Sequence, residues 1–496
     1  MEMQWKVTPC NYLRCTVREV QNQEQTQELR LTEGMPDIGR VLCAWGQPQL
    51  REKQWRSDEI SISGGINAWV LYIPEDGSQP RCVEGWIPFQ AKWKLPSDSR
   101  EGFIRADVRL RSMDARALSS RKMLVRASLA LMGETLEQRQ AEISQPDEVP
   151  EDVFLLRQTY PVNMAREAGE KLFSVEDSVP FTGEQPLKLL CCRVTYQVTE
   201  QAVTGSRVVL RGVLRVHYVY IGEDDQLHSS MQELPFGQFA DLEHDYDKEA
   251  TASISMAFAG TECALDGDGL RIKCDLIAQY VIYDRCLMQI TEDAYSPHRC
   301  ITPAVSQLEV PVVLDRVKET MDAEMEIPME AQRVVDVAFL PDHPVHYREN
   351  DNLVVELPGT FQTLYYDPEG NLQSDLRNWA GHWQLPSKDN CNFALSVDQC
   401  TQPTAMMLGD RMRLHTDLAL DVQTGAMQGI SMVNGLEIGE LTQPDPKRPS
   451  VILRKSGGMS LWELAKGCGS TVEAIEKANG ITGEPDPENM LLIPVM

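Results

Sequence analysis

The chain carries a β-strand pattern three times at a spacing near 145 residues, and this repetition limits the folds open to it. In each copy an apolar strand reaches a tyrosine and then an acidic turn. The tyrosines are Tyr72, Tyr220 and Tyr365, spaced by 148 and 145 residues. A second strand marker begins at Met123, Leu270 and Met412, with spacings of 147 and 142 residues. Two markers with similar periods indicate domain duplication and not a solenoid array of short repeats.

Apolar and polar residues alternate within the copies. In the second copy Leu214, Val216 and Tyr218 alternate with Arg215 and His217. A period of two places the apolar side chains on one face of a strand. Turn sequences such as "PEDG" and "GEDD" close these runs. We therefore predict a mainly β protein with three antiparallel modules of the sandwich or barrel type.

The two markers and the less regular stretches between them divide the chain. A stretch before the second module, "VNMAREAGEKLFSVEDS" at 162–178, is expected to form a helix. The expected parts are an N-terminal segment 1–25, a first module 26–135, a linker 136–174, a second module 175–295, a linker 296–325, a third module 326–438, a proline-rich linker 439–450 and a C-terminal domain 451–496.

The C-terminal domain has a different pattern. Two helix-like runs, "SLWELAKGC" and "TVEAIEKANG", lie between the strand-like runs "VILR" and "MLLIPV". Ser460 and Thr471 stand where helix N-caps belong, because a side-chain oxygen there accepts from free first-turn amides. Gly469 and Gly480 stand where the helices stop. The predicted order is strand, helix, helix, strand.

This tail resembles a lysin-motif (LysM) module. The resemblance rests on Gly457, Gly458, Ser460, Leu461, Trp462, Ala465, Val472, Ile475, Ala478, Asn479, Leu492, Ile493 and Pro494. It implies a small α+β domain that often binds N-acetylglucosamine-containing glycans through the loop after the first strand and the loop before the second. The residues expected to bind a partner or a glycan are Gly458, Met459, Ser460, Leu461, Ile481, Thr482 and Gly483.

The first copy resembles the SPOCS domain of endospore-forming bacteria. The matching positions are Asp114, Arg116, Ser120, Arg121, Lys122 and the strand from Met123. Repeated SPOCS modules before one LysM resemble spore-coat morphogenetic proteins. This implies a non-enzymatic adaptor in the mother-cell cytoplasm that tethers the basal coat layer to the forespore surface. The implied partner of the LysM is the spore-coat morphogenetic ATPase SpoIVA. The alternative is a protein that binds peptidoglycan or cortex, or chito-oligosaccharide, through the LysM.

The net charge of the chain and the motifs that its sequence lacks count against several classes of function. The net charge of −27 disfavours nucleic acid and anionic lipid as partners. No apolar run is long enough to span a membrane, and no basic-then-apolar signal region begins the chain. The thirteen cysteines are scattered, so reduced thiols are expected. No catalytic or cofactor motif stands out, and His343 and His346 are expected on a surface loop without a metal.

Overall fold

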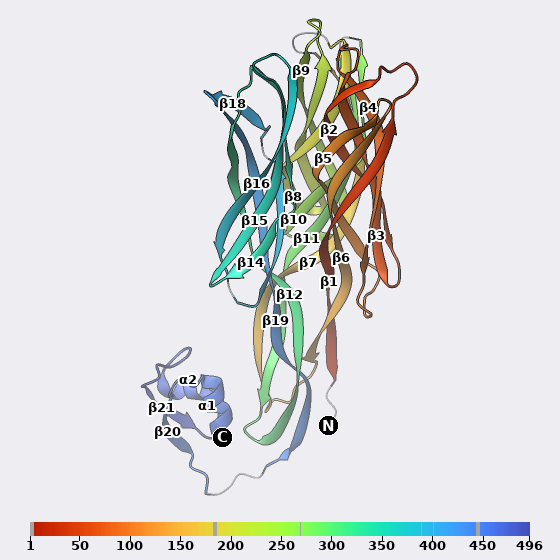
Figure 1. Cartoon of the computed structure of the whole chain (residues 1–496). Coiled ribbons are helices and arrows are strands. Elements are labelled where there is room, and N and C mark those ends of the chain that lie inside the picture. The colour runs from red at the N-terminus through yellow and green to blue at the C-terminus, as the bar shows by residue number, and fades with distance from the viewer. Residues whose placement is uncertain (1–3, 182–185, 268, 388, 400, 443–446) are drawn as a thin grey trace.

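The structure, a computed structural model, is built mainly from β-strands. It describes residues 4–181, 186–267, 269–387, 389–399, 401–442 and 447–496. Long strands run through an elongated body, and two short helices lie near the C-terminus (Figure 1). The predicted mainly β fold class and the helical character of the C-terminal region are confirmed.

Three sets of strands follow one another along the chain, and each set contributes to two sheets. In the first set, one sheet has the order β1–β6–β5 and the other has the order β2–β3–β4. These strands are β1 (Trp5–Arg30), β2 (Ile38–Trp55), β3 (Glu59–Pro74), β4 (Arg81–Lys94), β5 (Phe103–Ser119) and β6 (Lys122–Pro146).

The second set keeps this arrangement with one strand fewer. One sheet has the order β10–β11–β7, and β8 pairs with β9 in the other. These strands are β7 (Phe154–Pro180), β8 (Lys188–Ile221), β9 (Leu227–Tyr246), β10 (Thr251–Asp266) and β11 (Gly269–Tyr295).

In the third set, β19 pairs with β12, β17 and β18, while β15 pairs with β13, β14 and β16. These strands are β12 (Arg299–Pro328), β13 (Arg333–Pro341), β14 (Val345–Glu349), β15 (Asn352–Tyr366), β16 (Leu372–Pro386), β17 (Cys391–Gln399), β18 (Thr404–Leu408) and β19 (Arg411–Leu441). In all three sets the long first strand therefore pairs antiparallel with the long last strand.

Both sequence markers fall on corresponding hairpins of the three sets. The marker tyrosines lie near the ends of β3, β8 and β15, each just before the turn into the next strand. The second marker begins β6, β11 and β19, where Met123, Leu270 and Met412 are fully buried. The recurring apolar pattern thus marks the start of the long closing strand in each set.

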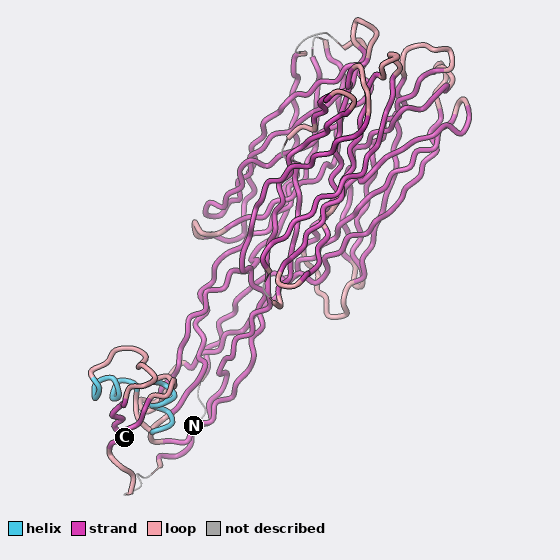
Figure 2. Tube along the Cα trace, turned by 60° about the vertical axis from the view of Figure 1, so that its left-hand side comes forward, coloured by secondary structure: helices cyan, strands magenta, loops and turns pink. Residues whose placement is uncertain are grey.

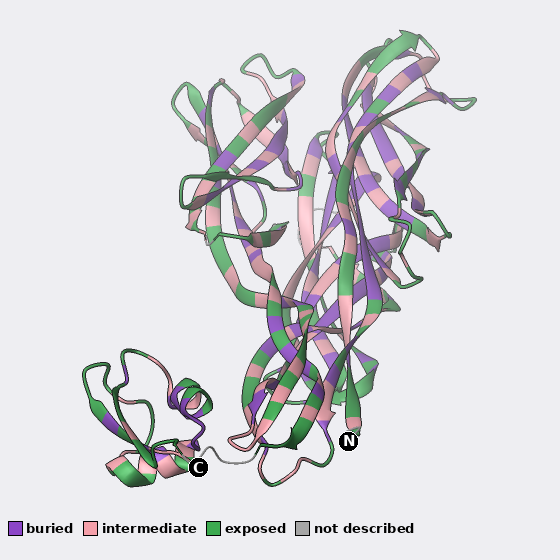
Figure 3. Ribbon diagram, turned by 90° about the horizontal axis from the view of Figure 1, so that it is seen from below, coloured by how far each residue is buried: buried purple, intermediate pink, exposed green. Residues whose placement is uncertain are grey.

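The long strand pairs extend beyond the other strands and form a narrower region that we call the stalk (Figure 2). Its core draws on all three sets, with Ile143 from β6, Met164 from β7, Ile290 from β11, Val310 from β12 and Ile430 from β19. Burial alternates along these strands, as Figure 3 shows from below. One face of each pair therefore packs inward on a shared core.

The helix expected at 162–178 is wrong, because this stretch is part of β7 and pairs along its length with β11. Pairing with a partner strand and burial of Val162 and Met164 in the stalk override the local sequence preference. The stretches expected as linkers, 136–174 and 296–325, likewise hold strand. The boundaries of the modules themselves stay predictions.

Hydrogen bonds tie the strand sets to one another. The buried Gln279 side chain of β11 donates to the Ala106 carbonyl at 2.7 Å and accepts from the Ala106 N–H at 2.9 Å. Arg193 of β8 lies 2.6 Å from the Asp336 carboxylate of β13. Each of these contacts joins different sets, so the three sets form one interdependent body.

The expectation of reduced thiols is wrong at two positions, because Cys192 and Cys263 are joined by a disulfide. They lie on β8 and β10, which contribute to the same apolar core in the second set. The two cysteines are 71 residues apart in the chain, so the sequence alone does not indicate that they are close in the fold. Cys10 and Cys286 are free, and their sulfur atoms lie 3.8 Å apart in the stalk.

The C-terminal tail has the predicted order, with β20 (Val451–Lys455), α1 (Leu461–Cys468), α2 (Val472–Asn479) and β21 (Met490–Pro494). Ser460 and Thr471 are the N-caps, and their side chains accept from first-turn amides. Gly469 and Gly480 end the helices in the left-handed conformation, with φ of 64° and 61°. Within the described residues, neither helix has the length and apolar character needed to cross a bilayer.

Candidate functional site

The two tail loops expected to bind a partner lie against each other. The Leu461 N–H donates to the Glu484 carboxylate at 2.8 Å. The Ser456 hydroxyl donates to the Asp486 carbonyl at 2.8 Å. The loop after β20 and the loop before β21 are therefore joined by hydrogen bonds that the tail makes with itself.

The predicted residues of the first loop differ in exposure. Gly458 is exposed and has a φ of 82°, which favours glycine. Met459 is half-buried and packs against the apolar core of the tail, and Leu461 is only 3 % exposed. The half-buried Ser460 is held in a capping box with Glu463. Gly458 is thus the member of this group whose surface is most open to a partner.

The second loop is more exposed. Thr482 and Gly483 are exposed, while Ile481 is half-buried and packs against the tail core. The Gly483 N–H donates to the Glu476 carboxylate at 3.2 Å. The backbone donors at Leu461 and Gly483 already have acidic partners within the tail. A glycan would have to displace these carboxylates to use the same N–H groups.

A row of apolar side chains on the outer face of the two-stranded sheet is not among the residues predicted from the sequence. We call this row the outer stripe; its members are Val451 (49 % exposed), Leu453 (61 %), Met490 (50 %) and Leu492 (45 %). Leu453 and Leu492 are directly opposite in the register of β20 and β21. The alternate residues Leu491 and Ile493 are buried against the helices.

A sequence signal for the outer stripe exists in the uninterrupted runs "VIL" and "MLL". A two-stranded sheet covered on one face needs apolar residues only on that face. Apolar residues at consecutive positions therefore place a second apolar row on the other face. Contiguous exposed apolar surface commonly marks a protein interaction site.

The tail is fixed to the stalk by its first helix. The Trp462 indole N–H donates to the Asp293 carboxylate at 2.8 Å, and the Lys466 ammonium lies 2.7 Å from the same group. Burial opposes ionisation of Asp293, but the hydrogen bonds from Lys466 and Trp462 outweigh it and hold its pKa below the usual range. The Trp462 ring also meets the Tyr295 ring edge-on, with centroids 4.7 Å apart.

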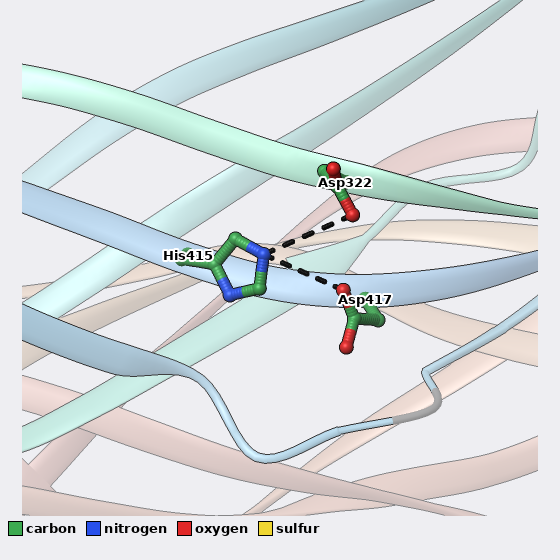
Figure 4. Close-up of side chains that lie close together, drawn as sticks. All are labelled: Asp322, His415 and Asp417. Atoms are coloured by element: carbon green, nitrogen blue, oxygen red, sulfur yellow. Dashed lines mark ion pairs between the residues drawn. The ribbon is translucent and has the colours of Figure 1, made fainter.

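One group of three potential metal ligands occurs in the part of the chain that the structure describes (Figure 4). His415 Nε2 lies 3.4 Å from Asp417 and 3.9 Å from Asp322. Asp322 and Asp417 are directly opposite in the register of β12 and β19. Asp322 is exposed and the other two side chains are half-buried, and exposed acidic groups commonly cluster in proteins without a metal. We therefore interpret the group as a polar cluster at the surface.

His343 and His346 are expected on a surface loop, but the structure places only His343 on a loop and only His346 at the surface. His346 is exposed on β14, but His343 is 6 % exposed, and its Nε2 lies 3.7 Å from the Asp107 carboxylate. The packing of β5 against this segment buries His343, and burial lowers its pKa to about 4.

The fold and the tail together define a β-rich protein of three intertwined strand sets with a small helical domain fixed to its stalk. Residues 185–266 match the family model described as SipL, SPOCS domain. The match lies within the second strand set and supports a SipL-like family, with a link to sporulation. No curated protein and no solved structure matches the chain.

Proposed function

We propose that the chain is a non-enzymatic adaptor of spore-coat assembly, in which the three strand sets are SPOCS-type modules and the tail is a LysM used to dock a protein. The family match at 185–266 supports the role in sporulation. The outer stripe of the tail is the observation that carries the docking role. In this proposal the adaptor works at the forespore surface and tethers the basal layer of the coat.

The chemistry of the tail favours a protein over a glycan as the docked partner. Exposed aliphatic side chains at the stripe offer apolar area, which is what the centre of a protein interface buries. Sugar recognition instead needs polar groups that are free to bond hydroxyls. In the tail, Glu484 and Glu476 already occupy the two loop N–H groups. The proposed partner is the coat ATPase SpoIVA, which the LysM resemblance implies.

The contact between α1 and the stalk gives the adaptor a fixed geometry. Asp293 and Tyr295 near the end of β11 hold Trp462 and Ser470 of the tail. The helices thus face the stalk, while the outer stripe lies on the sheet face that the helices leave uncovered. A partner bound at the stripe would be held at the stalk end of the body.

Localisation in sporulating cells tests the adaptor role. The full chain fused to a fluorescent protein should surround the forespore, and a chain that lacks 451–496 should spread through the mother cell. A Leu172→Lys variant serves as the control, because Leu172 is 65 % exposed but lies on β7, outside the tail. Unchanged localisation after removal of the tail would contradict its role as the anchor.

A further inference from the structure

A cavity of about 210 Å³ lies where the three strand sets meet. The first set contributes residues of β2 and β5, the second contributes β8 and β10, and the third contributes β13 and β17. Figure 1 shows β2, β5, β8 and β10 in the wide upper part of the body. The cavity therefore belongs to the assembled body and could not exist in one set alone.

The cavity is large enough for a small organic molecule. An apolar cavity of about 150 Å³ inside a protein can hold a benzene ring. Much of the wall is apolar, with contributions from Leu50, Val108, Met256, Phe258 and Phe339. A molecule with one ring or a short branched chain would thus fit and meet apolar surface on several sides.

Most of the charge that lines the cavity is already balanced within the protein. The Arg109 guanidinium bonds the Asp107 carboxylate at 2.8 Å, and it also donates to the Val397 carbonyl at 2.9 Å. Arg193 is paired with Asp336. These two guanidinium groups are therefore poor candidates for the capture of an anion.

Asp398 is the exception. Among the described residues no hydrogen bond or ion pair involves its carboxylate, although it lines the cavity and interacts at longer range with the positive charge of Arg109. Its side chain is accessible, yet desolvation by the surrounding protein raises its pKa. Because Asp398 lines the cavity, part of its side-chain surface faces that space.

His217 is a second unpartnered polar group in the wall. It is 8 % exposed, it lines the cavity, and no hydrogen bond involves its ring within the described part of the chain. Buried polar groups normally have a partner. Asp398 and His217 thus leave one carboxylate and one imidazole available to a molecule inside the cavity.

We propose that this cavity binds a small molecule with an apolar body and one protonated amine, which Asp398 holds by a charge-assisted hydrogen bond. An ammonium group supplies the positive charge and the donors that the carboxylate lacks. The apolar body fills the space between Leu50, Val108 and Phe258. An anionic molecule is disfavoured, because Asp398 would repel it and both arginines are already paired.

Fluorine NMR on the full-length protein tests this with two probes of the same shape, 4-fluorobenzylamine and 4-fluorobenzyl alcohol. The amine should bind with saturable line broadening, and Asp398→Asn should weaken its binding by about tenfold or more. The alcohol should bind more weakly, and its binding should change little in the Asp398→Asn variant. Asp410→Asn is the matched control. Asp410 is exposed on the β18–β19 turn, so this substitution removes the same charge outside the cavity.

A second variant separates the cavity from other amine sites. Val108→Phe adds volume to the cavity wall and should reduce binding of both probes, with thermal unfolding used to verify that the variant is folded. The proposal is overturned if neither probe binds the wild-type chain. It is also overturned if the amine binds either Asp398→Asn or the folded Val108→Phe variant as tightly as it binds the wild type.

Discussion

At the scale of single residues, the buried histidines make stability depend on pH. Burial and the nearby cations Arg193 and Arg215 lower the pKa of His217 to about 3, from an ordinary value of 6.5. The unfolded chain therefore takes up a proton below about pH 6.5, whereas the folded chain does not until the pH is much lower. This part of the stability is fully present above pH 6.5 and is lost as the pH falls toward the folded pKa.

We predict that His217→Gln reduces this dependence. In the wild type, each histidine that stays neutral in the folded chain adds up to about 1.4 kcal/mol per pH unit to the loss of unfolding free energy below about pH 6.5. The variant should lose one such contribution, which urea unfolding between pH 7 and pH 5 would measure. His382→Gln at an exposed position is the control. An identical slope for the wild type and His217→Gln would show that His217 is not protected from protonation in the folded chain.

At the scale of elements, the contact between α1 and β11 decides whether the tail moves with the stalk. Asp293 bonds both Trp462 and Lys466, so its loss leaves two tail donors without a partner. We predict that Asp293→Ala weakens the contact by about 1–3 kcal/mol. Hydrogen exchange of the α1 amides should become faster, with Asp293→Asn intermediate because its amide oxygen can still accept from Trp462. Unchanged exchange in Asp293→Ala would mean that the contact contributes nothing to docking.

The elements also show what the sequence could and could not predict. Caps and glycine stops depend on neighbouring residues, so Ser460, Thr471, Gly469 and Gly480, together with the helix-like runs between them, predict the ends of the tail helices. The stretch 162–178 resembles a helix locally, but it forms a strand because it pairs with β11, at separations from 124 residues (Val162 and Cys286) to 93 residues (Ser178 and Arg271). Many positions of the stalk strands are polar and only one stripe is buried, so the sequence of these strands resembles that of linkers.

The candidate site was predictable to a lesser degree. Its two loops were located from the resemblance, but the burial of Leu461 and the bond between Leu461 and Glu484 depend on the folded tail. The outer stripe was visible as consecutive apolar residues, yet which row faces outward depends on where the helices pack. Alternation shows that a strand has two faces, but it does not identify the neighbour that covers each one.

At the scale of the whole molecule, the body depends on contacts between strand sets. Gln279 is fully buried, and its amide completes both backbone bonds of Ala106 in the first set. We predict that Gln279→Ala lowers the free energy of unfolding by about 1–3 kcal/mol, because both Ala106 groups lose their partner. Gln289→Ala, at an exposed position of the same strand, should have little effect in the same urea titration. Equal stabilities for these two variants would contradict the importance of the contact between sets.

The central claim is that the tail docks a protein and not a glycan, and one binding titration tests it most directly. Purified full-length chain would be immobilised and titrated in parallel with SpoIVA and with chitohexaose, together with the variants Leu453→Lys and Leu172→Lys. The account predicts saturable binding of SpoIVA that Leu453→Lys weakens by about tenfold or more and Leu172→Lys leaves unchanged, with no binding of chitohexaose. Saturable binding of chitohexaose without binding of SpoIVA would contradict the account and favour attachment to the cortex.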